Sequence, residues 1–98
     1  MIYELKNTVE AVQLKWNNWS EICEFVPDSC HYGGCYVNRT TGETDANPIW
    51  AEEDMKIGFR LRNDKYGTVL AVENDWIVKV GKNDFHKVTD SVFQALRK

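Results

Sequence analysis

The sequence lacks the features that mark membrane-spanning, secreted and disulfide-rich proteins. No segment of the 98-residue chain approaches the roughly 20 apolar residues that a transmembrane helix needs. Met1–Lys6 has no basic region followed by an apolar one, so we expect no signal peptide. The three cysteines are an odd number, which does not make a disulfide framework. These absences predict a cytoplasmic protein with no membrane partner.

Motifs for catalysis and cofactor binding are also missing. Gly33-Gly34 by itself is not a glycine-rich phosphate loop, and nothing in the sequence indicates an oxyanion hole. A thiol nucleophile could be drawn from Cys30 or Cys35 with a histidine, but sequence neighbours rarely form such a pair. We therefore expect no enzymatic activity, no catalytic residue and no cofactor.

A zinc site could be built only from Cys23, Cys30, His31 and Cys35. Their spacing, C-x6-C-H-x3-C, lacks the C-x2-C pair of zinc knuckles. Cys23 also lies on the predicted apolar stripe of a helix, where a buried cysteine acts as a small hydrophobe. The sequence therefore predicts no metal site. A zinc-binding or thiol enzyme that uses Cys30, His31 and Cys35 is the last-ranked alternative.

The sequence does have enough apolar and aromatic material for one core. Hydrophobic residues make up 43% of the chain, which includes four Trp, four Tyr and four Phe. This content is far above that of disordered chains, and the length is that of one domain. We therefore expect a single domain over residues 1–98. Aromatic rings in this number can fill a small core or leave some rings exposed for binding.

The charge is divided unequally along the chain. The net charge of −3 combines −7 over residues 1–54 with +4 over residues 55–98. Such an asymmetry can orient a charged partner. The alternative is that a surface of two signs only favours solubility.

The first half begins with a predicted strand and helix. Thr8–Lys15 alternates as a strand does, and Asn18 with Glu21 predicts a capping box that begins a short helix. Pro27 ends it. The helix presents an inward stripe that comprises Trp19, Ile22, Cys23 and Val26, with Phe25 beside it.

The middle of the chain is less regular. Gly33-Gly34 predicts a break, Cys35–Arg39 a strand, and Thr41-Gly42 the tip of a hairpin. Asp45–Asp54 contains a proline and several acids, which predicts a loop, with Ile49 and Trp50 attached to the core.

Strand patterns return in the second half. They cover Met55–Arg62, Tyr66–Val72, Trp76–Val80 and Phe85–Val88. Asp90 caps a final predicted helix, Ser91–Lys98, and the apolar residues expected to face the core in this region are Trp76, Val78, Val80, Phe85, Val88, Val92, Phe93 and Leu96. Because the connections are too short for parallel crossovers, the sequence predicts an α+β fold with an antiparallel sheet of about five to six strands.

Two blocks of the sequence resemble a known group of proteins. Asp75–Gly81, Asp84–Val88 and Asp90–Phe93 resemble the C-terminal pattern of small phage and prophage proteins, G-D-(Y/W)-I-(V/I)-K-G, then E-F-Y-P, then D-(I/V)-F. Val9–Gln13 and Glu21–Val26 are similar to the first strand and helix of that group. Asn74 replaces the first glycine of the pattern, and residues 27–65 match nothing in it. Most members of the group have no assigned activity.

This resemblance implies a phage accessory protein that acts in the cytoplasm of the host cell. Small phage proteins of this size commonly bind a host factor or disarm a host defence. The first hypothesis is therefore a non-enzymatic protein that binds and inhibits a host protein, such as a component of an antiviral system of the CRISPR or another type. Features particular to this chain are expected within Pro27–Lys65.

A second hypothesis is a sponge that sequesters a nucleotide signal at the interface of a homo-oligomer. Arg60, Arg62 and Lys56 lie on one predicted strand, and the candidate stacking partners are Tyr66, Trp50 and Trp76. Arginine forks with aromatic faces suit a nucleotide or phosphate ligand. The alternative is an outward basic strand face with no ligand.

The acidic residues give a further candidate surface. Glu52, Glu53 and Asp54 are consecutive and, with Glu43 and Asp45, form either a solvated face or an imitation of phosphates toward a basic partner. In an extended loop, the three consecutive side chains would point apart. Nucleic acid itself is not an expected partner of a chain with this charge.

Overall fold

The computed structural model describes residues 2–5, 9–63 and 67–96, and the side chains of residues 10–62 and 67–95. Strands predominate. Their bounds are β1 Ile2–Leu5, β2 Val9–Gln13, β3 His31–Asn38, β4 Thr44–Asp45, β5 Met55–Asn63, β6 Gly67–Val72, β7 Trp76–Gly81 and β8 Asp84–Val88. The helices are α1 Trp19–Phe25 and α2 Asp90–Leu96, with the short 3-10 helices η1 Asp28–Cys30 and η2 Glu52–Asp54.

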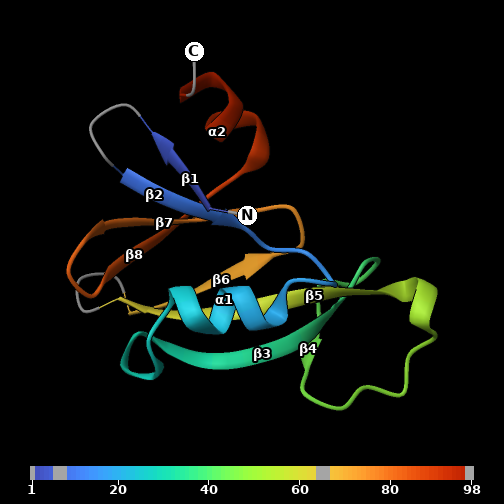
Figure 1. Cartoon of the computed structure of the whole chain (residues 1–98). Helices are drawn as coiled ribbons and strands as arrows, with labels where there is room; N and C mark the ends of the chain where they lie inside the picture. The colour runs from blue at the N-terminus through green and yellow to red at the C-terminus, as the bar shows by residue number, and fades with distance from the viewer. Residues whose placement is uncertain (1, 6–8, 64–66, 97–98) are drawn as a thin grey trace.

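The strands form two antiparallel sheets of four strands each. Sheet A has the order β1-β2-β7-β8 and therefore combines the two ends of the chain. Sheet B has the order β4-β3-β5-β6 and comes from the middle. In Figure 1 sheet A lies above sheet B, and α2 lies above sheet A. The consecutive strands β3–β4, β5–β6 and β7–β8 are hairpins, as their short connections require.

The larger core lies between the two sheets. Phe59 and Leu61 of β5 are fully buried there, as are Val12 of β2 and Ile77 of β7. Helix α1 closes this core. Ile22 of the helix and Val26, the residue that follows it, are the two fully buried residues of the predicted stripe. Its remaining buried members are Leu14, Cys30, Ile57, Ala71 and Phe85. One continuous apolar layer therefore joins sheet A, sheet B and α1.

A smaller core lies on the other face of sheet A, beneath α2. The ring of Phe93 is fully buried and stacks on the Trp76 ring, with centroids 3.7 Å apart and planes 7° from parallel. Ala11 and Val78 complete this cluster. The Trp76 indole Nε1 donates a hydrogen bond of 2.9 Å to the Asp90 carboxylate, so the polar end of the ring is also satisfied. Sheet A is thus covered on both faces.

The structure confirms the α+β class, the antiparallel pairing, the helix after an N-terminal strand and the C-terminal helix. It distributes the strands over two sheets, and it adds β1 and β4. The predicted break at Gly33-Gly34 is wrong, because both glycines lie inside β3. The predicted loop Asp45–Asp54 includes the end of β4 and all of η2.

Three residues expected in the core are exposed. Val80 is 51% exposed, because the pairing of β7 with β8 shifts register between Lys79 and Gly81. Val92 is also 51% exposed, since its neighbour Phe93 provides the contact between α2 and sheet A. Cys23 is exposed on α1. The predictions for Tyr66, for Lys65 and for the side chain of Leu96 fall outside the described residues.

Candidate functional site

The turn between β2 and α1 is held by the side chain of Asn18. Its amide nitrogen donates to the Gln13 carbonyl at 2.6 Å, and its oxygen accepts from the Lys15 backbone N–H at 2.9 Å. Asn18 stands at the predicted N-cap position but makes no side-chain bond to a helix N–H, so the predicted capping box is wrong. The side chain closes the preceding turn instead. That turn presents Trp16, which is 44% exposed.

Trp19, the first residue of α1, covers a glycine of sheet B. A Cβ atom placed on Gly34 would fall on the Trp19 indole ring. The indole also meets the Phe59 ring edge-on, with centroids 5.5 Å apart. Gly34 is therefore required because the Trp19 ring lies too close to β3 to leave room for a side chain. This accounts for the second glycine of the Gly33-Gly34 pair.

An open pocket of about 370 Å³ lies where this turn meets β3 and β4. Trp16, Trp19 and Tyr36 provide its aromatic lining, and the Trp16 and Tyr36 rings are 5.7 Å apart with a tilt of 30°. Gly34, Cys35, Ile57 and Ala46 complete it. Its volume lies near the lower end of the range for ligand pockets, about 300–1,000 Å³. The pocket can accept one or a few side chains or a small ligand.

Three charged residues directly precede lining residues of this pocket: Lys15, Asp45 and Lys56. Lys15 Nζ donates to Asn74 Oδ1, and Lys56 is the register partner of Val37 on the opposite face of sheet B.

Asp45 is the register partner of Tyr36 in the β3–β4 pair, so the two side chains share a face, and it directly precedes the lining residue Ala46. One oxygen of its carboxylate accepts from the Asn47 backbone N–H at 3.0 Å, which holds it in place. None of the described residues that line the pocket is Lys or Arg.

The face of sheet B that points away from the pocket and from the shared core has an apolar centre. Cys35, Val37 and Leu70 all lie within about 3 Å of the place where a Cβ on Gly58 would stand. Cys35 is 7% exposed and Val37 is 4% exposed. Burial raises the pKa of the Cys35 thiol, and the positive charge of Arg60 offsets part of this rise. A buried thiol of raised pKa is a poor nucleophile.

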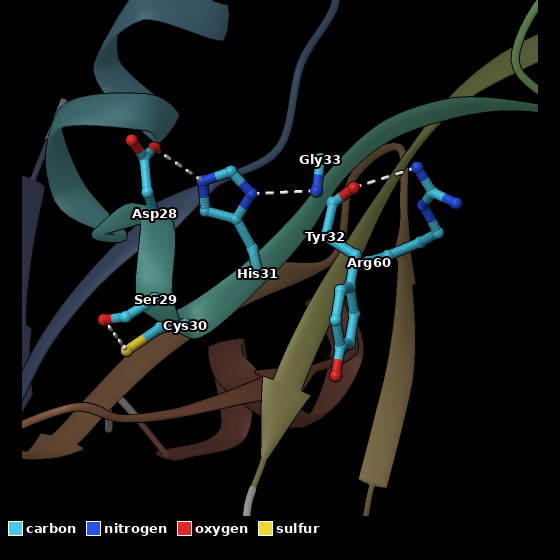
Figure 2. Close-up of polar contacts among 7 residues, drawn as sticks. All are labelled: Asp28, Ser29, Cys30, His31, Tyr32, Gly33 and Arg60. Carbon is cyan, nitrogen blue, oxygen red and sulfur yellow. Dashed lines mark hydrogen bonds and ion pairs between the residues drawn. The ribbon is translucent and has the colours of Figure 1, made fainter.

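His31 and Arg60, two of the candidate binding residues, both bond to the backbone of a bulge in β3. The register with β5 shifts between His31 and Gly33, which leaves the Tyr32 backbone out of the regular ladder. Arg60 Nη2 donates to the Tyr32 carbonyl at 2.9 Å, and the Gly33 N–H donates to His31 Nδ1 at 2.8 Å, as Figure 2 shows. His31 Nε2 lies 3.6 Å from the Asp28 carboxylate. His31 and Arg60 together satisfy the bulge and present Tyr32, which is 55% exposed.

The described residues proposed for a nucleotide site lie partly apart: Arg60, Arg62 and Lys56 are on β5, and Trp76 is on β7. Arg60 is engaged with the β3 backbone, and Trp76 is 3% exposed beneath α2 in the other sheet. Arg62 Nη1 donates to the Ser29 carbonyl at 3.4 Å, and Lys56 is half-buried at the far end of β5. Tyr66 lies outside the described residues. The homo-oligomer of that hypothesis stays a prediction.

The acidic segment and its apolar neighbours differ from expectation. Glu52, Glu53 and Asp54 form η2 and are all exposed, so they are not extended. Trp50 is half-buried, but Ile49 is 100% exposed and does not attach the loop to the core. This fully exposed apolar side chain lies in the same loop as the pocket residue Ala46.

The possible metal ligands lie apart. Cys30 belongs to the core between the sheets, Cys35 lies on the opposite face of sheet B, and Cys23 is exposed on α1. Among the described side chains, no three of the types His, Cys, Asp and Glu form a group that could hold a metal ion.

The pocket itself was missed by sequence reasoning. Trp19 is assigned to the core by its spacing, and Trp16 and Tyr36 carry no motif. The one available signal is Trp16 and Trp19 on either side of Asn17-Asn18, because a turn exposes its residues, and Tyr36 has none.

Neither α1 nor α2, at seven residues each, has the length or hydrophobicity of a membrane-spanning helix, and the described residues contain no other candidate. Comparison with models of protein families, with curated proteins and with solved structures finds no match to this chain.

Proposed function

We propose that this chain is a non-enzymatic accessory protein of a phage or prophage that binds a host protein through the aromatic pocket and inhibits it. The observation that carries the proposal is the pocket lined by Trp16, Trp19 and Tyr36, which lies open at the surface. Trp and Tyr are the residues most enriched at binding hot spots, since they bury a large area at low entropic cost. A component of an antiviral system is the class of target that the phage resemblance favours.

The neighbourhood of the pocket supports a protein partner over a small molecule. Ile49, in the same loop as the lining residue Ala46, is fully exposed, so that loop offers an apolar side chain to a partner. Asp45, the strand partner of Tyr36, adds a polar group beside the lining. Protein interfaces combine a central aromatic anchor with a polar rim in this way.

The test is affinity capture from a lysate of the host with the tagged chain and two variants. Trp16→Ala removes a pocket ring that is 44% exposed, so it leaves both cores intact. Val92→Ala is the matched control, because Val92 is 51% exposed on α2, which packs on sheet A and not on the pocket. We expect wild type and Val92→Ala to retain the same host protein. Trp16→Ala should bind that protein at least about 30-fold more weakly than wild type does.

The captured protein is then assayed for its own activity with each variant added. Inhibition should follow binding, with wild type and Val92→Ala equally effective. Retention that does not depend on Trp16, or binding without loss of the host protein's activity, would refute the proposal.

A further inference from the structure

We infer that the aromatic pocket receives an arginine side chain of the partner protein, held by the Trp16 and Tyr36 rings and by the Asp45 carboxylate. This inference rests on the proposed function and names the chemistry that the pocket recognises.

The lining has the composition of a site for a planar cation. Trp16 and Tyr36 lie 5.7 Å apart with a tilt of 30°, so the two rings border the same opening. Aromatic faces attract cations through the quadrupole of the ring, and tryptophan does so most strongly. A guanidinium group can also stack flat on such a ring, which an ammonium group cannot.

The charges favour a cation over an apolar side chain. Asp45 shares the face of Tyr36 through their β3–β4 pairing, and it directly precedes Ala46 in the lining. Its Oδ1 accepts the Asn47 N–H, so the carboxylate is already oriented when a ligand arrives. The pocket is also built largely from residues 1–54, which carry a net charge of −7. A cationic group would be drawn to this half of the chain.

The cations among the described side chains do not line the pocket, whose described lining includes no Lys or Arg. Arg60 is the arginine of β5 that pairs with β3, and it donates to the Tyr32 and Gly34 carbonyls. Because its strand partner is Gly33, its side chain lies on the face of sheet B opposite the pocket. Arg39 pairs with Glu73 at 3.5 Å. An arginine from a partner therefore meets no competing positive charge within the pocket.

The test uses three small probes on the full chain: N-acetyl-arginine methylamide, the lysine analogue and the citrulline analogue. Citrulline has nearly the shape of arginine without its charge. The readout is the set of tryptophan indole N–H signals in a ¹H–¹⁵N NMR spectrum at matched ionic strength. The Trp76 indole, which is bonded to Asp90 beneath α2, is the internal reference.

We expect the arginine probe to shift the Trp16 and Trp19 signals and to leave Trp76 unchanged. The lysine probe should bind more weakly, and citrulline should produce no saturable shift. Trp16→Phe and Asp45→Asn should each weaken the arginine probe by roughly 2- to 5-fold. Glu24→Gln, which removes one exposed acid of α1 outside the lining, should leave its affinity unchanged.

Two results would overturn the inference: citrulline that binds as well as arginine, or an arginine probe that shifts neither indole at 100 mM. With either result, the proposed function is still supported if the Trp16→Ala variant fails to retain the host protein in the capture experiment. Loss of the proposed function is detected separately, by capture that does not depend on Trp16.

Discussion

Sheet A and sheet B differ in how completely the chain covers them. Sheet A, which combines the two ends of the chain, is buried on one face by α2 and on the other by the core it shares with sheet B. Sheet B comes from the middle of the chain, and neither described helix packs on its outer face. The same contrast holds for aromatic residues. Trp76 of sheet A is buried, whereas Trp16 and Tyr32 beside sheet B are exposed.

The two sheets also differ in which segments of the chain form them. The segments compared above with phage proteins contain β2, β7 and β8 of sheet A, most of α1 and the start of α2, but not β1. The segment from 27 to 65, which resembles nothing in that group, provides β3, β4 and β5 and most of the pocket. Most lining residues of the pocket therefore come from the middle segment, whereas Trp16 and Trp19 come from the turn and helix that follow β2.

The largest expected effect tests the shared core. Phe59→Ala should lower the free energy of unfolding by about 3–5 kcal/mol, because its ring is fully buried against the Trp19 and His31 rings. Leu70→Ala, on the half-buried outer face of sheet B, should cost only about 1 kcal/mol. Urea unfolding monitored by circular dichroism measures both. Equal losses would show that the two faces of sheet B do not differ.

A substitution at Gly34 should damage both stability and the pocket. Gly34→Ala places a methyl group on the Trp19 indole and should cost about 1–3 kcal/mol by overpacking. Gly81→Ala is the control in sheet A, since its Cβ would meet only the Asp84 Cβ at 3.7 Å, an ordinary contact. Thermal unfolding should show a clear decrease for the first variant and almost none for the second. A stable Gly34→Ala protein with an unchanged Trp19 signal would contradict the close approach.

Arg60 distinguishes a structural role from a ligand-binding role on sheet B. Arg60→Ala removes the donor to the Tyr32 carbonyl and should lower the free energy of unfolding by about 1–3 kcal/mol. Lys82→Ala, in the exposed β7–β8 turn of sheet A, should change it by less than about 0.5 kcal/mol. Denaturant titration of the two variants side by side makes the comparison. If Arg60→Ala is as stable as wild type, the bulge does not depend on this arginine.

The attachment of α2 to sheet A should depend on pH. Hydrogen bonds from the Trp76 indole and from Gln94 lower the pKa of the Asp90 carboxyl below its ordinary value of 3.8. Because the pKa is lower in the folded state, the stabilisation is complete above about pH 4–5, and it is lost as the pH falls through the folded pKa. Asp90→Asn keeps an acceptor for the indole but cannot titrate. Its unfolding free energy should therefore fall less than that of wild type between pH 5 and pH 2.

The smallest expected effect is a difference in the reactivity of the three cysteines toward a thiol reagent. Cys23 is exposed, whereas Cys30 and Cys35 are buried and burial raises the pKa of Cys35. At pH 7 a thiol reagent should modify one cysteine quickly, and Cys23→Ser should abolish that fast phase. Mass spectrometry identifies the modified residue. Fast modification of Cys35 would show that the outer face of sheet B opens readily.

Periodicity predicted most of the regular elements because they alternate between a buried and an exposed side. Strands β2, β5, β7 and β8 and helix α1 lie close to where their patterns placed them. The pattern failed where tertiary contacts change the geometry. Val80 alternates correctly with Trp76 and Val78, yet the register shift after Lys79 turns it to solvent. Gly33-Gly34 reads as a break, yet Arg60 and Trp19 hold both residues in a strand.

The candidate site was less predictable than the fold. The candidate residues Arg60 and His31 prove to satisfy the backbone of a bulge, and Trp76 proves to belong to a core. Trp16, Tyr36 and Ala46 have no pattern that connects them, because they belong to a turn, a strand and a loop that meet only in the folded chain.

By itself the sequence determined the class of fold, because hydrophobic periodicity and short connections act locally and leave few other arrangements. It also determined the acidic character of the first half, which needs no structure to be counted. Only the tertiary structure decided which sheet faces the helices cover, because that depends on contacts between segments far apart in the chain. The aromatic pocket beside Asp45, where a turn, a strand and a loop meet, is what the folded arrangement added.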